Sequence, residues 1–286
     1  MITRFLTSIA LITATGCNKN NPDESAEDTD SGIIDETDTE PTGFPSSFEN
    51  GQFRVSSFVI LESTQGSDID GDGEIDNNLE SALTPMNLLL EGDFTRAGMN
   101  ERIAASMDPE VNDLVVLLEA AHTDLQLELQ LLTGAVEDAT LTVDPRSYDS
   151  DGKAHSLLHG EFSTETEFLV ETDALVLMIP FYPEQAPLPI TLELASMFGS
   201  LTTDSATGTL TGVIAGDVLL EQVVDPLIPE EGIDSDGDGV ADMTKEQLLE
   251  TVASILTNES IADIDLGDGR RGISTAFSFG AESSSW

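Results

Sequence analysis

The sequence predicts an α+β fold, an antiparallel β-sheet or sandwich with a few helices flanking two acidic loops. Apolar and polar residues alternate in several short runs between residues 111 and 214, as they do in strands with one buried face. Apolar residues at helical spacing occur mainly next to the two acidic loops. Of the 286 residues, 39% are hydrophobic, which is enough for a sizeable core, and we expect a single domain over residues 51–286.

Residues 1–16 have the pattern of an export signal. Arg4 supplies a positive charge, and the stretch from residue 5 to residue 15 is uncharged and mostly apolar. This stretch is too short to span a bilayer as a helix. We therefore expect residues 1–16 to be a signal peptide that is removed on export.

The only cysteine, Cys17, directly follows Ala14, Thr15 and Gly16. This tetrapeptide resembles the lipobox of bacterial lipoproteins, in which the cysteine is diacylated and becomes the new N-terminus. The resemblance implies a lipid anchor at Cys17, with the membrane of the cell envelope as a partner. Asn18 is not the Asp associated with inner-membrane retention, so the outer membrane is favoured, with periplasmic and surface exposure both open. The alternative is an ordinary cleaved signal followed by an unrelated cysteine.

Residues 17–50 differ in composition from the rest of the chain. After Cys17 they carry ten carboxylates and one Lys, together with Pro22, Pro41 and Pro45. Without apolar periodicity, such a segment buries too little surface to offset its chain entropy. We expect an extended acidic tether between the lipid and the domain.

Several runs have the patterns of β-strands. Alternation, or a continuous apolar run in the case of residues 174–179, predicts the following strands: 53–61, 124–131, 174–179, 188–194, 210–214 and 273–279. Turn signals separate these runs at 144–145, 150–152 and 183–189.

Helical patterns lie beside the acidic loops. Residues 218–224 suit a short helix that ends before Pro226. Thr244, with Gln247 three residues later, predicts a capping box at the start of a second helix. After the first loop we expect a helix that is broken near Pro85 and resumes beyond it.

Two stretches, residues 68–80 and 234–246, share one acidic pattern. Both have Asp at positions 1, 3, 5 and 9, Gly at position 6 and Glu at position 13, while position 7 offers a backbone carbonyl. The candidate ligands of the first stretch are Asp68, Asp70, Asp72, Glu74, Asp76 and Glu80. Those of the second are Asp234, Asp236, Asp238, Val240, Asp242 and Glu246.

This spacing predicts calcium ligation. Ca²⁺ takes six to eight oxygen ligands in a flexible geometry, and alternating Asp residues on a tightly turning loop converge on one point. Neither stretch contains His or Cys, so Zn²⁺ is disfavoured, and Mg²⁺ demands a stricter octahedral geometry. With one cysteine, the domain has no disulfide to stabilise it. We therefore expect two structural Ca²⁺ sites.

The two stretches resemble EF-hand-like calcium loops of the DxDxDG class, as found in dockerins and thrombospondin type 3 repeats. An EF-hand has its bidentate Glu at position 12, where this chain has Leu79 and Lys245. Glu80 and Glu246 come one residue later, so their ligation stays open. The chain as a whole resembles uncharacterised bacterial lipoproteins with one such loop early and another before the C-terminus, a resemblance that implies no activity.

The charge of the chain excludes one class of partner. Asp and Glu number 55 against 10 Lys and Arg, a formal net charge of -45. No basic patch for nucleic acid can be built from so few cations.

Candidate catalytic patterns are weak. His155 and His159 are four residues apart, but the HExxH arrangement is missing. Ser150 and Lys153 match SxxK within a turn rather than at the start of a helix. We therefore predict no catalytic residues.

We expect an exported, lipid-anchored calcium-binding protein with a binding or structural role at the cell envelope, where its partner would be an envelope protein or a glycan. The alternative is a secreted-type hydrolase acting on polysaccharide, with calcium as a structural ion. A cleft holding two carboxylates away from both calcium loops would favour the hydrolase.

Overall fold

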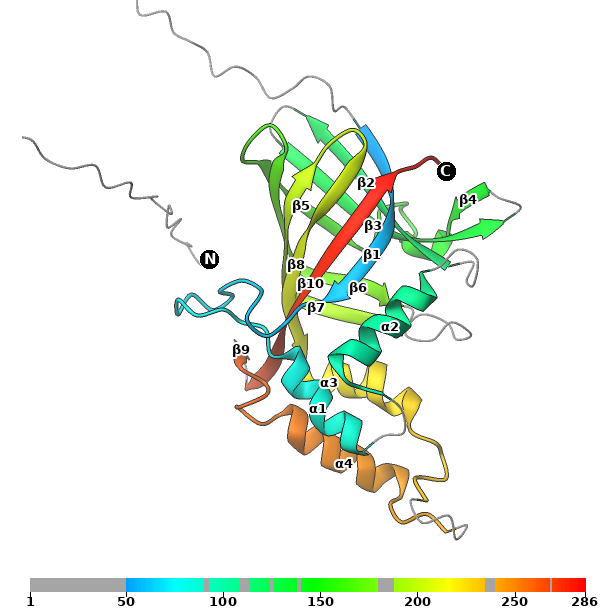
Figure 1. The fold of residues 1–286 in the computed structure, drawn as a ribbon, viewed down its shortest axis with the longest axis vertical. Helices are drawn as coiled ribbons and strands as arrows, with labels where there is room; N and C mark the ends of the chain where they lie inside the picture. Colours follow the sequence, from blue (N-terminus) through cyan, green and yellow to red (C-terminus); the bar gives the residue numbers. More distant parts are fainter. Residues whose placement is uncertain are drawn as a thin grey trace, which may run out of the picture. The chain divides into compact units, whose positions relative to one another are not determined.

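The structure is a computed structural model, and it describes residues 50–89, 93–107, 114–123, 126–137, 140–179, 188–234, 240–267 and 269–286. Nearly half of these residues lie in antiparallel β-strands (Figure 1). In chain order the strands are β1 (Asn50–Ile60), β2 (Leu114–Thr123), β3 (Gln126–Glu137), β4 (Thr140–Val143), β5 (Leu157–Phe162), β6 (Glu167–Ile179), β7 (Leu188–Leu201), β8 (Ser205–Ala215), β9 (Ile264–Gly267) and β10 (Arg270–Ser283).

Eight of the described strands form a closed antiparallel barrel. Its order is β1-β2-β3-β5-β6-β7-β8-β10, and β10 pairs back onto β1. The register of this closing pair runs from Phe53 opposite Ser283 to Ile60 opposite Phe277. The short strands β4 and β9 extend β3 and β10 outside the ring.

The barrel corrects the expected α+β sheet or sandwich, which is wrong. The closing pair joins strands from opposite ends of the described chain, and the residue pattern of neither strand indicates it. Closure gives the first and last strands partners on both sides, so that neither is left as a long free edge.

Apolar side chains at alternate positions fill much of the barrel. In β3, Leu127 and Leu129 are buried, and β6 contributes Phe168 and Val170. The interior of an eight-stranded barrel is just wide enough for side chains to fill it or to leave room for one small ligand.

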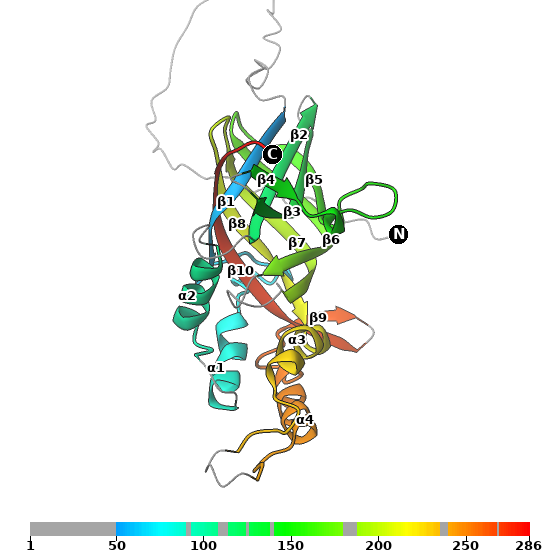
Figure 2. The same cartoon turned by 90° about the vertical axis from the view of Figure 1, so that its right-hand side faces the viewer.

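The helices gather at one end of the barrel (Figures 1 and 2). They are α1 (Leu79–Leu89), α2 (Arg96–Ser106), α3 (Gly216–Leu219) and α4 (Lys245–Leu256), with a π-helical turn η2 (Leu220–Val224) and a 3-10 turn η3 (Asp225–Leu227) after α3. Helices α1 and α4 contact each other and bury Leu83, Met86, Leu248 and Val252. Their apolar faces extend the core beyond the strand ends.

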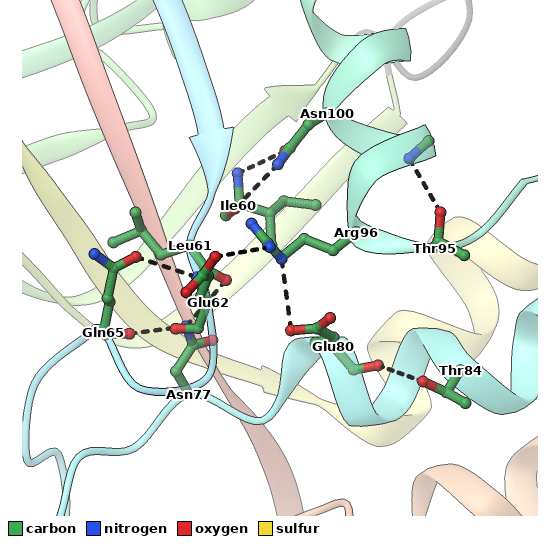
Figure 3. Close-up of polar contacts among 11 residues, drawn as sticks. Ile60, Leu61, Glu62, Gln65, Asn77, Glu80, Thr84, Thr95, Arg96 and Asn100 are labelled. Atoms are coloured by element: carbon green, nitrogen blue, oxygen red, sulfur yellow. Dashed lines mark hydrogen bonds and ion pairs between the residues drawn. The ribbon is translucent and has the colours of Figure 1, made fainter.

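Helix α2 lies against the part of β1 that β2 does not reach. The pairing of β1 with β2 ends at Arg54, whereas β1 continues to Ile60. There the Asn100 side chain accepts a hydrogen bond from the Ile60 amide at 2.8 Å and donates one to the Ile60 carbonyl at 3.1 Å (Figure 3). One side chain thus takes the place of a neighbouring strand.

A second, smaller apolar cluster lies outside the barrel wall. Leu117 of β2 and Leu132 of β3 are buried there, with Tyr148 and Trp286 packed against them. The segment that covers them includes β4 and a 3-10 turn, η1 (Pro145–Ser147), which Asp144 caps.

Most expected elements are confirmed. The predicted strands overlap β1, β3, β6, β7, β8 and β10, with 53–61 running one residue past β1 and 124–125 outside the described residues. The helix over 218–224 corresponds to α3 and η2. The predicted break near Pro85 is wrong, because α1 continues to Leu89 and the helices separate after it. Pro85 removes one amide donor, while Leu83 and Met86 on either side of it stay buried and hold the helix in place.

Residues 1–49 lie outside the described part of the chain. They include the predicted signal peptide, Cys17 and nearly all of the predicted tether, whose expected end at residue 50 is already the first residue of β1. Most of the predicted turn at 183–189 also lies outside the described residues.

Candidate metal centre

The first acidic loop connects β1 to α1 and is closed at its base. The amide of Asp76 donates a hydrogen bond to the carbonyl of Ser67 at 2.9 Å. This pair brings position 9 of the pattern next to the residue that precedes position 1. The carboxylates between them are therefore forced into one tight turn.

The carboxylate of Asp68 organises the turn. Its two oxygens accept hydrogen bonds from the amides of Gly71 at 2.6 Å and Gly73 at 2.9 Å. Both glycines have a positive φ, 83° and 93°, a conformation that residues with a Cβ rarely adopt. The Gly at position 6 of the pattern, Gly73, is thus required by the backbone.

Three carboxylates meet in this loop. Each of Asp68, Asp70 and Asp76 offers one oxygen, and the three oxygens lie within 4.8 Å of one another. Oxygens on opposite sides of a Ca²⁺ ion are separated by about 4.8 Å, twice a typical Ca–O distance of about 2.4 Å. The cluster could therefore hold one metal ion.

Asp76 is the most perturbed member of the cluster. Its partial burial raises the pKa of the carboxyl group, and the nearby charges of Asp70 and Asp263 raise this pKa further. The amides of Ile69, at 2.6 Å, and Asp70, at 3.3 Å, oppose this rise by donating to the same carboxylate oxygen. A cation bound here would relieve the repulsion between the carboxylates.

The remaining predicted ligands of the first loop lie outside this cluster. Asp72 accepts a hydrogen bond from the Glu74 amide at 2.8 Å, and Glu74 itself is exposed. Glu80 belongs to the first turn of α1, and its carboxylate lies 3.5 Å from the guanidinium of Arg96 (Figure 3). The same guanidinium also pairs with Glu62 at 3.1 Å, so Arg96 links the two ends of the loop to α2.

Two asparagines that sequence reasoning did not assign anchor the loop. The side-chain nitrogen of Asn77, which is buried, lies within hydrogen-bond distance of the carbonyls of Leu61, Glu62 and Gln65 (Figure 3). The amide group of the next residue, Asn78, donates to the carbonyls of residues 260 and 261 at 3.0 and 2.9 Å. The only sequence signal for them is their position directly after the acidic pattern.

A fourth carboxylate, that of Asp263, lies close enough to the cluster to act on it. Its carboxylate accepts a hydrogen bond from the Ser274 amide at 2.9 Å, and its charge acts on Asp76. Asp263 lies between α4 and β9, far from the loop in sequence. No local pattern could have connected it to Asp76.

The second acidic loop is described only in part. Residues 235–239, which include Asp236 and Asp238, lie outside the described residues. At its base the Asp242 amide donates to the Ile233 carbonyl at 2.8 Å, the counterpart of the bond from Asp76 to Ser67. Like the first loop, it leads directly into a helix, here α4, which begins after Thr244 and contains Glu246.

The histidine pair does not form a metal site of the kind that its spacing would give on a helix. His159 lies on strand β5 with an exposed side chain, whose ring is 3.7 Å from the Glu128 carboxylate. His155 precedes this strand and lines an interior cavity of the barrel. Ser150 lies in the turn after η1, as expected, rather than at a helix start.

Comparison of the chain with protein-family models, with curated proteins and with solved structures finds no match. Among the described residues, no helix is long and apolar enough to cross a membrane.

Proposed function

We propose that the chain is an exported, lipid-anchored and calcium-stabilised protein with a binding role at the cell envelope. The calcium part of the proposal rests on the convergence of Asp68, Asp70 and Asp76. The loop that holds them is closed at its base by the hydrogen bond from the Asp76 amide to the Ser67 carbonyl. The lipoprotein-like start of the chain, with Cys17 as the anchored residue, supports the location, and Asn18 favours the outer membrane.

Calcium fits this loop better than other common ions do. The cluster offers only oxygen ligands, which suit Ca²⁺ and Mg²⁺ rather than Zn²⁺. The proposed ligand set adds the Asp72 side chain, the Glu74 carbonyl and water to the three clustered carboxylates. A loop with this many flexible oxygen donors suits the larger and less strictly coordinated Ca²⁺.

A second site is proposed in the loop before α4. Its support is the shared sequence pattern and the shared hydrogen bond at the base of both loops. The proposed ligands are Asp234, Asp236, Asp238, the Val240 carbonyl, Asp242 and, if position 13 takes part, Glu246.

The calcium proposal is tested by thermal unfolding of the full-length chain in EGTA and in 5 mM Ca²⁺. With a dissociation constant of about 0.1 mM, binding at one site stabilises the fold by about 2 kcal/mol, or roughly 5 °C. Asp76→Asn removes one of the clustered carboxylates and should lose most of the contribution of the first site. Glu74→Gln removes the same charge from an exposed side chain of the same loop and should retain it. A wild-type melting temperature that is the same in EGTA and Ca²⁺ refutes the proposal.

The anchor is tested separately. Metabolic labelling with a radioactive fatty acid should mark the wild-type protein, and Cys17→Ser should abolish the label and move the protein from the membrane fraction to the soluble one. Label that persists in Cys17→Ser would contradict the lipobox interpretation.

No observation in the described part of the chain favours a hydrolase. The interior cavity of the barrel is lined by a single acidic side chain, Asp144, which is paired with Arg146. Glycoside hydrolysis requires two carboxylates facing one substrate, and the described lining of this cavity does not supply them.

A further inference from the structure

The barrel is not completely filled by its side chains. A cavity of about 430 Å³ lies within its wall, bounded by strands β1, β2, β3, β6, β7, β8 and β10 and by helix α2. This volume lies in the range of roughly 300–1,000 Å³ that small-molecule sites have. None of the residues of the first acidic loop lines it.

The strand pairing explains why a cavity forms at this place. Strand β2 pairs with β1 only as far as Leu117, and beyond this point α2 takes its place along β1. Strand β5 is short and begins only at Leu157. Before it, the Ser156 hydroxyl donates a hydrogen bond to the carbonyl of Val176 on β6. The wall therefore widens between β1 and β6, and the side chains present do not fill the extra width.

The cavity is apolar on most of its surface. Its strand-borne wall includes Val55, Val116, Leu131, Met197, Leu210 and Phe279. Helix α2 and the residue that follows it contribute Ile103 and Met107. An apolar void of this size leaves its lining atoms without contact partners and destabilises the fold, so an occupant that restores those contacts would be bound favourably.

Polar groups are confined to one side. Thr133, Ser147, His155 and Ser156 line the cavity there, together with Asp144 and Arg146. The two charged side chains pair with each other, since the Arg146 guanidinium donates to both Asp144 oxygens. The described lining therefore presents hydrogen-bonding groups but no unbalanced charge.

The net charge of the chain further restricts the class of ligand that the cavity can bind. A protein with a net charge of -45 repels anions over distances longer than the cavity mouth, and a cation would lack a free carboxylate within this lining. A neutral ligand avoids both costs.

We propose that this cavity binds one small, uncharged and largely apolar molecule, with a hydroxyl or carbonyl group directed toward Ser147 and His155. The proposal gives a ligand class to the binding role proposed above and rests on that role. It does not depend on calcium, because the first acidic loop and the cavity share no residues.

The first test is titration of the full-length chain carrying Cys17→Ser, which leaves no acyl group to compete, with the neutral fluorescent probe N-phenyl-1-naphthylamine. We expect saturable binding of one equivalent at micromolar concentration. 1-Dodecanol should displace the probe at least tenfold more effectively than dodecanoate. Absence of saturable binding refutes the site, and equal displacement by dodecanoate refutes the uncharged class.

A matched pair of variants locates the probe. Leu131→Trp fills the cavity from β3 and should weaken binding at least tenfold. Gln130→Trp places the same indole on the opposite face of the same strand and should change binding less than twofold. Binding that is unchanged in Leu131→Trp would place the probe elsewhere and overturn the proposal.

If Leu131→Trp does not fold, methyl NMR of the protein without this substitution tests the same site. In the methyl NMR spectrum of ¹³C-methionine-labelled protein, 1-dodecanol should shift the signals of Met107, Met178 and Met197, which line the cavity. The signals of Met99 and Met243, which do not line it, should stay in place. Shifts confined to the second set, or no shifts, refute the site.

Repeating the fluorescent-probe titration in EGTA separates the cavity proposal from the calcium proposal. We expect EGTA to remove the stabilisation by calcium and to leave probe binding intact.

Discussion

Asn77 shows how one side chain can hold a loop in register. It is 5% exposed, and its side-chain nitrogen lies 2.8 Å from the Gln65 carbonyl, 2.9 Å from that of Glu62 and 3.4 Å from that of Leu61. These carbonyls belong to the turn between β1 and the acidic loop, and that of Glu62 also accepts a hydrogen bond from the Gln65 amide at 2.8 Å. Because one hydrogen bond contributes about 0.5–1.5 kcal/mol to stability, the bonds of the buried Asn77 side chain stabilise the backbone that presents Asp68 and Asp76.

Asn77→Ala should therefore lower the free energy of unfolding by about 1–2 kcal/mol, through the loss of the hydrogen bonds from its side-chain nitrogen. It should also weaken calcium binding, because the loop base loses its anchor. Urea unfolding followed by circular dichroism measures the first effect. Asn50→Ala, at the exposed start of β1, is the matched control and should change stability by less than about 0.5 kcal/mol. Equal stabilities of the two variants would contradict the anchoring role.

At the scale of single elements, α4 is the helix whose start was best predicted. The Thr244 hydroxyl accepts from the Gln247 amide at 3.3 Å, and the Gln247 side chain accepts from the Thr244 amide at 3.0 Å. Both bonds satisfy amides that have no partner within the helix. The capping box also fixes the direction in which the chain leaves the second acidic loop.

Thr244→Ala should destabilise the protein by about 1 kcal/mol, because it removes the side-chain oxygen of the cap. Ser254→Ala, at an exposed interior position of the same helix, should be neutral or slightly stabilising, since Ala has the higher helix propensity. Thermal unfolding of the two variants at saturating Ca²⁺ separates the cap from any effect on the ion. A loss of the same size in Ser254→Ala would contradict the capping argument.

The turn η1 gives a prediction about pH. Hydrogen bonds from the Arg146 guanidinium and then from the Arg146 amide hold the pKa of Asp144 below its usual 3.8. A lowered folded-state pKa stabilises the fold above the unfolded-state value, and the stabilisation is lost as the pH falls through the folded-state value. Asp144→Asn should thus be slightly less stable than wild type at neutral pH, because Arg146 is mostly exposed, and the difference should disappear as the pH falls below 3.8 and through the lowered folded-state pKa of Asp144. Arg146→Gln should show the same convergence in acid unfolding curves, and a difference that grows toward low pH would contradict the sign.

Six of the ten described strands, and the first acidic loop, could be predicted from the sequence, because both depend on local patterns. Asp68, Asp70 and Asp76 were chosen from spacing alone, and the structure brings their oxygens together. The pattern could not show that Glu80 pairs with Arg96, or that Asp263 lies beside Asp76, because these partners are distant in sequence. Local patterns predict which residues form a loop, whereas tertiary packing decides what surrounds it.

The architecture of the whole molecule was the least predictable feature. An open sandwich and a closed barrel use the same alternating strands and differ only in whether the first strand meets the last. Here β1 meets β10 along most of its length, with Phe58 opposite Phe279 and the Phe58 ring stacked on Phe277 at 4.9 Å. The interior cavity follows from this closure, because it lies where the closed wall is widest and least regularly paired.

Closure makes a prediction for hydrogen exchange. In an open sheet the outer strands expose a row of amides. In the barrel, β10 pairs with β8 and with β1, while β1 pairs with β10 from Phe53 to Ile60 and with β2 as far as Arg54. Amides of β10, and those of β1 that are hydrogen-bonded to β10, should therefore exchange as slowly as those of β6 and β7, through global unfolding, while β4 and β9, which lie outside the ring, exchange much faster. Exchange measured by mass spectrometry on peptides covering these strands, at saturating Ca²⁺, distinguishes the cases. Rapid exchange of β1 beside protected β6 and β7 would mean that the seam is open in solution and that β1 and β10 do not form a stable wall of the interior cavity.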